Sequence, residues 1–319
     1  MMSNREVVLG IDTSCYTTSV ALLDLDGKLV EDRRKLLLVG QGKCGLAQSE
    51  MVFQHTRNLP ELLTGIDFKN FTVKAIGATN KPRPLAESYM PAFLTGWGLA
   101  RNLGQVLGVP VYPLSHQENH LEGGLWSAQG PKAPRFLMLH ASGGTTDILL
   151  VEFTAEGKIS LTTVGESIDL HAGQFVDRVG VALGLNFPCG PTLEKLAMEG
   201  QKDQIVLPVW VRENKVSFSG VCTKAVRLAQ AGANKFDLAL ATEQVLGKAF
   251  GKVLGNICGA HKLTDVLLVG GVSANKLIRE IVTKTLDKEE IHTFVPEPKY
   301  SGDGAVGAAY YALQKVRMG

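Results

Sequence analysis

Two histidines in the middle of the chain have a spacing that suits a metal ion. His116 and His120 stand four residues apart in the segment LSHQENHLEGG, and on a helix this spacing places both imidazoles on one face. Imidazole nitrogens suit divalent iron, zinc or manganese. Two ligands are too few, so a third must come from elsewhere. Asp303 either supplies that carboxylate or caps the helix that follows it. A pair of solvated or capping histidines is the alternative to a metal site.

Short turns of small polar residues form a second group of candidates. The turn Ser142–Thr146 (SGGTT) can point backbone N–H groups and hydroxyls at one spot and so cradle a phosphate. The segment Gly270–Asn275 (GGVSAN) precedes a helix, where glycines permit close approach and the helix N-terminus favours anions. Asp169, Asp177 and Glu194 could accept ribose hydroxyls. Plain hairpins, an ordinary strand-to-helix turn and, for Asp177 and Glu194, a solvated helix face are the alternatives.

The elements that position these residues follow from a repeat. Residues 7–30 and 136–159 both consist of an apolar run, a small polar turn, a Thr-Thr pair, a second apolar run and a glycine turn. The matching pairs are Thr17-Thr18 with Thr145-Thr146, at an offset of 128, and Gly27-Lys28 with Gly157-Lys158, at an offset of 130. A repeat at this distance indicates two homologous domains rather than a solenoid. Asp26-Gly27 after an apolar run also predicts a hairpin turn.

Helices and strands alternate in the rest of the chain, which implies mixed sheets covered by helical layers. The predicted helices are Ser49–Leu63, Ala86–Leu107, His171–Leu183, Pro191–Glu199, Phe236–His261 and Gly304–Val316, and the predicted strands are Val73–Ala78, Val109–Tyr112 and Val266–Gly270. On the long helix, Gly247, Gly251 and Gly255 stand four apart, which would permit close packing of a neighbouring helix.

Two facing phosphate turns, one in each lobe, are typical of the actin, hexokinase and Hsp70 superfamily. We therefore expect a two-lobed α/β protein with the actin-like ATPase (ASKHA) fold, built of duplicated mixed-sheet domains around a central cleft. The expected lobes are residues 1–132 and 133–303. The C-terminal helix, residues 304–319, is expected to pack back on the first lobe.

Composition narrows the choice of partners and of compartment. A length of 319 residues suits two domains, and a net charge of only +2 means that any contact with nucleic acid must come from a local patch. Five cysteines without a C-x2-C pair argue against a disulfide framework or a cysteine zinc site. No apolar run approaches the roughly 20 residues of a membrane helix, so we expect a cytoplasmic protein. Bases that could contact phosphates, or form a solvated charged face, are Arg33, Arg34, Lys35, Lys81 and Arg83.

Taken together, the motifs resemble those of the TsaD (Kae-type) family, the transferases that attach a threonylcarbamoyl group to adenosine 37 of certain tRNAs. The resemblance runs nearly end to end. The family's G-I-E-T-S-C opening corresponds to Gly10–Cys15, H-x-E-x-H to His116–His120, S-G-G-x-T to Ser142–Thr146, G-E-[ST]-x-D to Gly165–Asp169, G-G-P-x-x-E to Cys189–Glu194, F-S-F-S-G to Val216–Gly220, G-G-V-A-A-N to Gly270–Asn275 and the closing T-D-N to Gly302–Gly304.

The resemblance implies an acyltransferase with two bound groups. A divalent metal, iron or zinc and otherwise magnesium or manganese, would lie on His116, His120 and Asp303 and act as a Lewis acid. An adenine nucleotide, whether ATP, ADP, AMP or threonylcarbamoyl-AMP, would bind Ser142, Gly143, Gly144, Thr145, Thr146, Asp169, Gly173, Gly190, Glu194 and Asn275. The implied catalytic residues are Asp12, Ser14 and Thr17. The implied partners are tRNA and subunits similar to TsaB and TsaE, and a homodimer is a further expectation.

Three departures from the family pattern keep alternatives open. The family's S-C-D-E-T becomes Ser14–Thr18, with Tyr16 and Thr17 where two acidic residues are expected. Its G-P-G-L loop becomes Lys81–Pro84, and the histidine of S-G-G-H-T becomes Thr145. The metal triad is intact. The alternatives are a divergent carbamoyl-type transferase or ATPase with another acceptor, and a non-catalytic nucleotide-binding partner subunit.

Overall fold

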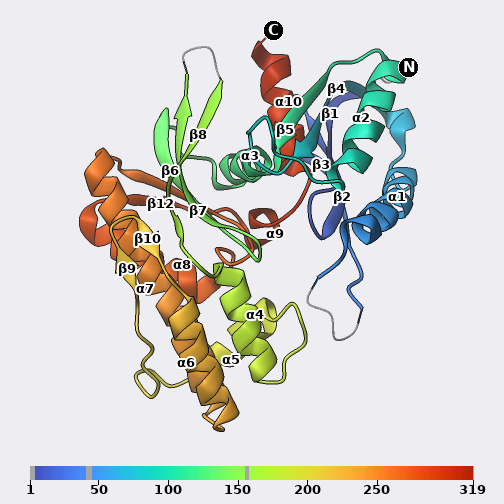
Figure 1. Ribbon diagram of the computed structural model, residues 1–319. Helices are drawn as coiled ribbons and strands as arrows, with labels where there is room; N and C mark the ends of the chain where they lie inside the picture. The colour runs from blue at the N-terminus through green and yellow to red at the C-terminus, as the bar shows by residue number, and fades with distance from the viewer. Residues whose placement is uncertain (1–3, 41–44, 155–157, 319) are drawn as a thin grey trace. The chain divides into compact units, whose positions relative to one another are not determined.

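The chain folds into two compact units, each with one sheet and its own helices (Figure 1). The structure, a computed structural model, describes residues 4–40, 45–154 and 158–318. Cys44, Gly157 of the second predicted glycine turn, and the residues before position 4 lie outside this part. The first unit comprises Met1–Ser127 with Asp303–Gly319, and the second Ala128–Gly302. Among the described residues, no helix combines the length and apolarity needed to cross a membrane.

The sheet of the first unit has the strand order β3-β2-β1-β4-β5. β1, β2 and β3 pair antiparallel, and β4 and β5 add on the other side of β1 in parallel. The predicted turn at Asp26-Gly27 joins β2 to β3, with Gly27 at a φ of +88°. Every residue of β2 is buried, as expected for a strand with cover on both faces of its sheet. The strands are β1 Arg5–Asp12, β2 Thr17–Asp24, β3 Leu29–Leu36, β4 Phe71–Lys81 and β5 Val111–Ser115.

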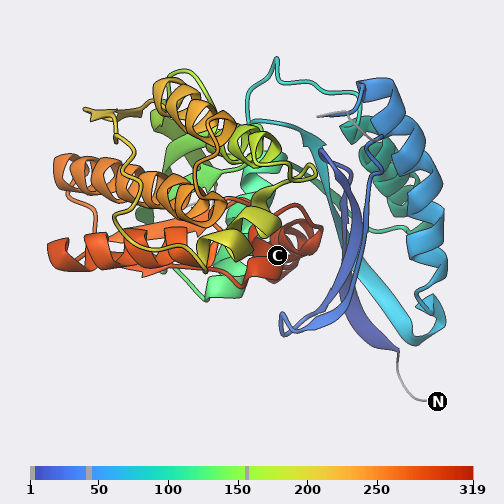
Figure 2. The ribbon, with the colours of Figure 1, turned by 90° about the horizontal axis from the view of Figure 1, so that it is seen from below.

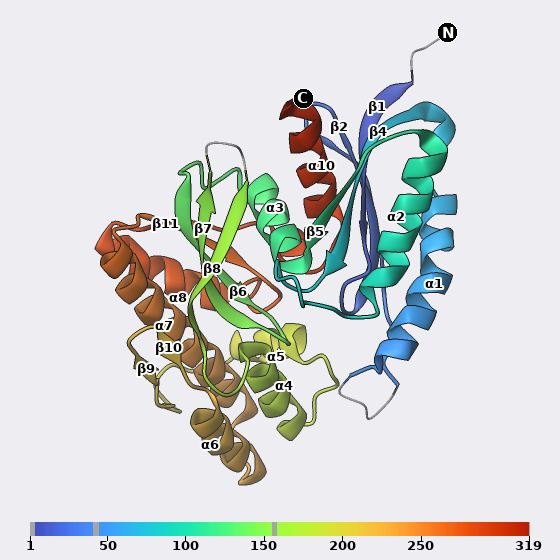
Figure 3. The same cartoon turned by 45° about the horizontal axis from the view of Figure 1, so that its top comes forward.

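Helices cover both faces of this sheet. α1 and α2 lie on one face and α10 lies on the other (Figures 2 and 3). α10 and the residue before it approach so closely that a Cβ atom on Gly10 of β1 would overlap the carbonyl oxygen of Ala305, and one on Gly77 of β4 would overlap that of Ala308 in the helix. The C-terminal helix is therefore an integral layer of the first unit. The helices are α1 Gln48–Thr64, α2 Phe93–Leu107, α3 His116–Ala128 and α10 Val306–Met318.

The sheet of the second unit repeats the topology of the first. Its order is β12-β11-β6-β7-β8-β10-β9, so β8-β7-β6-β11-β12 corresponds to β3-β2-β1-β4-β5, with the same sequence of antiparallel and parallel pairs. This correspondence confirms the duplicated mixed-sheet fold predicted from the repeat. The strands are β6 Arg135–Ala141, β7 Thr146–Phe153, β8 Ile159–Ser167, β9 Val211–Arg212, β10 Lys215–Val216, β11 Asp265–Val269 and β12 His292–Phe294.

The hydrophobic core of the second unit lies between its sheet and a layer of helices, and α7 contributes many of its buried side chains. Two of the glycines that stand four apart on α7 lie against α8 and the third against the turn after it, which confirms the predicted close packing: Gly247 faces Ile281, Gly251 faces Thr285 and Gly255 faces Glu289. The helices are α4 Ala172–Ala182, α5 Gly190–Ala197, α6 Ser219–Gln230, α7 Lys235–His261, α8 Lys276–Leu286 and the short α9 Pro298–Ser301.

Two predicted elements are wrong at their boundaries. The helix predicted from Ala86 begins only at Phe93, because Pro91 lacks an N–H and disfavours helix in the residue before it. The preceding segment forms turns, in which Lys81 Nζ donates to the carbonyl oxygen of Leu85 at 3.1 Å. The strand predicted at 109–112 runs instead from 111 to 115. The helix predicted after Gly270–Asn275 is confirmed as α8, whereas α6 was not predicted.

Candidate metal centre and nucleotide-binding turns

The two histidines of the candidate metal centre occupy the first turns of α3. β5 ends at Ser115, whose Oγ accepts a hydrogen bond from the N–H of Glu118 at 3.2 Å, while Glu118 Oε2 accepts from the N–H of Ser115 at 2.6 Å. This reciprocal pair is a capping box, which fixes where the helix begins. The capping box therefore sets His116 and His120 on successive turns of one helix face.

Asp303 joins these histidines within the first unit. Its Oδ1 lies 3.4 Å from His120 Nε2 and 3.8 Å from His116 Nε2, and the two Nε2 atoms are 3.2 Å apart. Ligand atoms bonded at about 2.1 Å to one tetrahedral metal would lie about 3.4 Å from each other. The three residues therefore fit a divalent metal in donor type and in spacing.

The protonation states of this cluster also suit a metal. Burial and the neighbouring His120 lower the pKa of His116 to about 4, against the opposing effect of Asp303. Burial alone would raise the pKa of Asp303, but hydrogen bonds from His120 and from the backbone N–H of Tyr16, with the charge of His116, lower it. At neutral pH the cluster thus offers a neutral His116 imidazole and a carboxylate, the forms that bind cations.

Asn119, which the sequence analysis missed, connects α3 to the Asp303 loop. Its Nδ2 donates to the carbonyl oxygen of Gly304 at 2.9 Å, and the residue is buried. Asn119 therefore ties the helix with the two histidines to the segment with the carboxylate. An asparagine within an H-x-x-x-H segment gives no signal for such a contact, because its partner is 185 positions away.

The first turn holds two of the three predicted catalytic residues in an internal network. Asp12 is fully buried and accepts hydrogen bonds from Thr79 Oγ1 at 2.6 Å, from Ser14 Oγ at 2.8 Å and from the Ser14 N–H at 3.0 Å. Burial raises the pKa of Asp12 to about 6 although these hydrogen bonds oppose the shift. Asp12 thus fixes the position of the Ser14 hydroxyl.

The third predicted catalytic residue, Thr17, begins β2 and is buried. Its neighbour Tyr16 packs in a small apolar cluster with Leu37, Leu46, Met51 and Ala92. Tyr16, which stands where the family has an acidic residue, therefore packs in an apolar cluster of the first unit. His55, which the sequence analysis did not single out, lies behind Thr18, with its Nδ1 2.8 Å from Thr18 Oγ1.

In the second unit, the turn Ser142–Thr146 connects β6 to β7 and is closed by backbone hydrogen bonds. The N–H of Ser142 donates to the carbonyl oxygen of Thr145 at 2.8 Å, and Gly173 lies directly beneath the turn, with its N–H 3.1 Å from the Ser142 carbonyl oxygen. A Cβ on Gly173 would come within 2.6 Å of Gly143, so packing requires this glycine. On Gly143 or Gly144 a Cβ would meet no described atom, so packing does not explain these two.

Asn275 and Glu194 meet at the start of α8. Asn275 caps this helix, because its Oδ1 accepts from the N–H of Ile278 at 3.0 Å. Its Nδ2 donates to Glu243 Oε1 at 2.7 Å, and Glu194 Oε1 accepts from the N–H of Lys276 at 2.7 Å. Burial raises the pKa of Glu243 to about 8. Glu243 was not predicted; its signal in the sequence is a single carboxylate in an otherwise apolar stretch of the long helix.

The remaining carboxylates have partners of their own. Asp169 accepts hydrogen bonds from Ser217 Oγ at 2.6 Å, from the N–H of Phe218 at 2.9 Å and from Ser219 Oγ, and these bonds lower its pKa against the effect of burial. Asp177 Oδ1 accepts from the N–H of Cys189 at 2.8 Å. Asp169 thus ties the segment after β8 to the start of α6, and Asp177 ties α4 to α5. Gly190 opens α5, where an added Cβ would meet no described atom.

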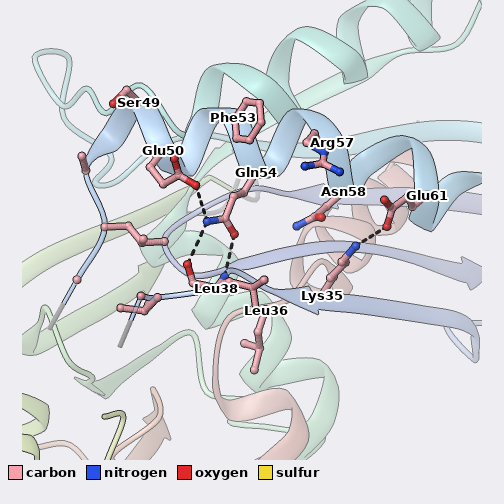
Figure 4. Close-up of a pocket in the computed structure, with 15 residues that line it drawn as sticks. Lys35, Leu36, Leu38, Ser49, Glu50, Phe53, Gln54, Arg57, Asn58 and Glu61 are labelled. Carbon is pink, nitrogen blue, oxygen red and sulfur yellow. Dashed lines mark hydrogen bonds and ion pairs between the residues drawn. The ribbon is translucent and has the colours of Figure 1, made fainter. Parts of the chain in front are cut away.

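A groove of about 740 Å³ runs along α1 and the end of β3 in the first unit (Figure 4). Gln54 anchors the strand end: its Oε1 accepts from the N–H of Leu38 at 2.8 Å, and its Nε2 donates to the Leu38 carbonyl oxygen at 3.1 Å. Lys35 and Glu61 form an ion pair across the groove. Among the described residues that line it, none belongs to the predicted metal, nucleotide or catalytic residues, and of the bases predicted to contact phosphates only Lys35 lines it.

Comparison with known sequences gives a match over most of the chain. A family model described as tRNA N6-adenosine threonylcarbamoyltransferase (TsaD) matches residues 56–310. The tRNA N6-adenosine threonylcarbamoyltransferase of Thermosipho africanus is 30% identical to this chain and aligns with 97% of this chain and 94% of its own length.

Solved structures share the fold at low sequence identity. The activator of the 2-hydroxyisocaproyl-CoA dehydratase from Clostridium difficile, with bound ADPNP, has a TM-score of 0.57 at 15% identity, over 98% of this chain and 96% of that one. A ROK family glucokinase from Streptomyces griseus, in complex with glucose and AMPPNP, has a TM-score of 0.56 at 12% identity, over 97% and 99%. The chain therefore shares the fold of these two proteins, which confirms the predicted fold class.

Proposed function

Because the chain belongs to the TsaD family of tRNA N6-adenosine threonylcarbamoyltransferases, we propose that it transfers a threonylcarbamoyl group from threonylcarbamoyl-AMP to N6 of adenosine 37 in tRNA. The observation that carries the proposal is the cluster of His116, His120 and Asp303, whose nitrogen and oxygen atoms converge within 3.8 Å. These residues match the family's metal motif and fit a metal in spacing and charge.

His116, His120 and Asp303 would hold a divalent metal, and we propose iron or zinc because two imidazoles with one carboxylate suit these ions. When bound, the metal supplies Lewis-acid polarisation of phosphate or carbamoyl oxygens. The capping box of α3 and the Asn119 contact to the Gly304 carbonyl oxygen support this role, because they keep the three donors close together before any ion binds.

The adenine nucleotide is proposed to bind the second unit. The turn Ser142–Thr146 would offer its amides and hydroxyls to phosphate oxygens, and Gly143 and Gly144 leave room for close approach. Asp169, Gly173, Gly190, Glu194 and Asn275 complete the proposed nucleotide site. In support of this role, a Cβ on Gly190 would also meet no described atom, so packing does not explain that glycine either.

The reaction centre is proposed at the first turn. Ser14 and Thr17 carry the hydroxyls that would contact the acyl donor or the attacking amine. Asp12 orients Ser14 by accepting from both its hydroxyl and its N–H. The hydroxyls of Ser14 and Thr17 would take over the polar contacts of the acidic residues that the family has next to this turn.

We further propose that the protein acts in the cytoplasm on tRNA, with subunits similar to TsaB and TsaE that make the adenylate and help to dock the tRNA. A homodimer is part of the same proposal. The net charge of +2 is too small for strong long-range attraction of tRNA, which favours partner-assisted docking.

A reconstituted transfer assay tests the function. Purified protein, threonylcarbamoyl-AMP, unmodified tRNA and partner subunits are combined, and the tRNA nucleosides are quantified by mass spectrometry. We expect modified adenosine with the unaltered protein and with the control His292→Ala, which replaces an exposed histidine, and none with His120→Ala. Absence of product next to an active relative would overturn the proposal and favour another acceptor or a binding subunit.

A further inference from the structure

Arg34 reaches the backbone of the predicted metal ligand Asp303. It lies on β3, opposite Ser19 of β2, which in turn lies opposite Asp12 of β1. Residues paired across antiparallel strands share one face of the sheet, so Arg34 and Asp12 lie on the same face. The Nη1 of Arg34 donates to the Asp303 carbonyl oxygen at 3.1 Å.

A second carboxylate sets the orientation of this guanidinium. Arg34 Nε donates to Asp32 Oδ1 at 2.9 Å, and the side chain of Asp32 is only 4% exposed. This ion pair with a buried carboxylate therefore restricts the rotamers of Arg34, which a solvated arginine would sample freely. The pair is also neutral overall, so it adds no net positive charge beside a cation site.

Gly304 provides the room for Arg34. A Cβ at this position would lie 2.7 Å from Arg34 Cζ, so any other residue would displace the guanidinium. The peptide unit around Asp303 is thus held at three points: by Arg34 at the Asp303 carbonyl oxygen, by Asn119 at the Gly304 carbonyl oxygen, and by the Tyr16 N–H at the Asp303 carboxylate. The close approach of Arg34 thus explains why Gly304 stands where the family's closing T-D-N motif has asparagine.

The geometry points to Arg34, oriented by Asp32, as a positioning residue that fixes the Asp303 backbone and thereby directs its carboxylate to the metal shared with His116 and His120. This inference rests on the proposed function, since it assumes that the cluster binds a divalent metal. It replaces the expectation that Arg34 contacts tRNA phosphate or belongs to a solvated charged face. Removing a residue that hydrogen-bonds to a metal ligand and orients it typically weakens metal binding by about 10- to 100-fold.

Arg33 provides a matched control on the same strand. It pairs with Glu31 two residues earlier, at 3.1 Å, as Arg34 pairs with Asp32, and its guanidinium lies beside Gly65. The two arginines therefore have the same kind of ion pair, and the contact with the metal-ligand loop distinguishes Arg34. Replacing Arg33 removes an arginine and an ion pair from β3 but leaves the Asp303 contact in place.

The test measures Co²⁺ affinity of the full chain by competition with a chromophoric chelator, together with the visible absorption of the bound ion. We expect Arg34→Gln to weaken Co²⁺ binding about tenfold and to alter the absorption bands, which report the ligand geometry. Arg33→Gln should leave both unchanged, and Arg34→Lys should restore part of the affinity. Thermal melts establish that each variant is folded.

A double-mutant cycle adds a second criterion. Gly304→Ala should weaken Co²⁺ binding by displacing the guanidinium, and in the Arg34→Gln background it should add little. Unchanged affinity in Arg34→Gln, or equal losses in Arg33→Gln and Arg34→Gln, would overturn the inference while leaving the metal centre in place. If the unaltered protein binds no Co²⁺, the proposed metal centre fails, and the role of Arg34 fails with it.

Discussion

The side-chain amide of Asn275 donates a 2.7 Å hydrogen bond to Glu243, whose side chain lies buried within the long helix α7. One carboxylate oxygen, Oε1, has this partner, and Oε2 has none among the described residues. A cap of α8 and a proposed nucleotide contact therefore depend on a carboxyl group that is costly to ionise.

The stability of the protein should fall as pH rises through the titration of Glu243. Burial raises its pKa from 4.5 to about 8, with nearby Glu194 adding to the shift. Between these values the folded state holds a proton that the unfolded state has released, so stability is greatest below 4.5 and is lost up to about 8. Glu243→Gln keeps an oxygen for Asn275 but cannot ionise. Relative to the unaltered protein, it should gain stability on the order of 2 kcal/mol between pH 5 and 8, measured by urea unfolding. A pH-independent difference would contradict this.

Gly77→Ala should destabilise the first unit, because the new methyl group would force α10 away from the sheet. Overpacking of this kind costs about 1–3 kcal/mol. Gly98→Ala is the control: Gly98 lies inside α2 with no described atom within 4 Å of an added Cβ. There the higher helix propensity of alanine should stabilise by up to about 1 kcal/mol. Urea denaturation followed by circular dichroism measures both effects, and equal stabilities would refute the close approach of α10.

Gly143→Ala should weaken nucleotide binding without affecting the fold. An added Cβ meets no described atom, so stability should stay unchanged, but the methyl group would occupy the space proposed for a phosphate. We expect the Kd for ADP, measured by calorimetry, to rise on the order of tenfold, which corresponds to about 1.4 kcal/mol. Gly259→Ala, on an open position of α7 in the same unit, should bind ADP normally. Equal affinities in the two variants would remove this turn from the nucleotide site.

A divalent metal should stabilise the protein through Asp303. An ion that binds only the folded state at 100 times its Kd adds about 2.7 kcal/mol, so Zn²⁺ should raise the melting temperature by several degrees. Asp303→Asn removes the anionic ligand and should abolish most of this rise. Asp26→Asn, in the β2–β3 turn, should keep it. A metal-induced shift that persists in Asp303→Asn would place the stabilising ion elsewhere.

More of the fold than of the candidate site could be predicted from the sequence. The Thr-Thr repeat at an offset of 128 was enough to predict two copies of one topology, because a duplicated sequence preserves the order of its strands. The four-residue spacing of His116 and His120 predicted a common helix face, since that spacing is a property of the helix. The residues alone left Asp303 as either a helix cap or a metal ligand, the family resemblance implied the ligand role, and its contact with the histidines required a structure.

The contacts that support the site were beyond sequence reasoning. Arg34 and Asp303 are 269 positions apart, and neither residue type indicates the other. The start of α2 was misplaced because apolar periodicity continued through residues 86–92, whereas Pro91 and the side-chain bonds of the preceding turns decided the boundary. Metal binding, nucleotide binding and the catalytic roles of Asp12, Ser14 and Thr17 stay predictions.

The return of the chain's last segment to the first unit has a consequence for biosynthesis. Asp303 and α10 leave the ribosome after every other described element, whereas His116 and His120 emerge early. During translation the histidine pair lacks its carboxylate, and β1 and β4 lack the helix that covers them. The first unit can therefore complete its layers only after α10 has been made, and the proposed metal triad is incomplete until then.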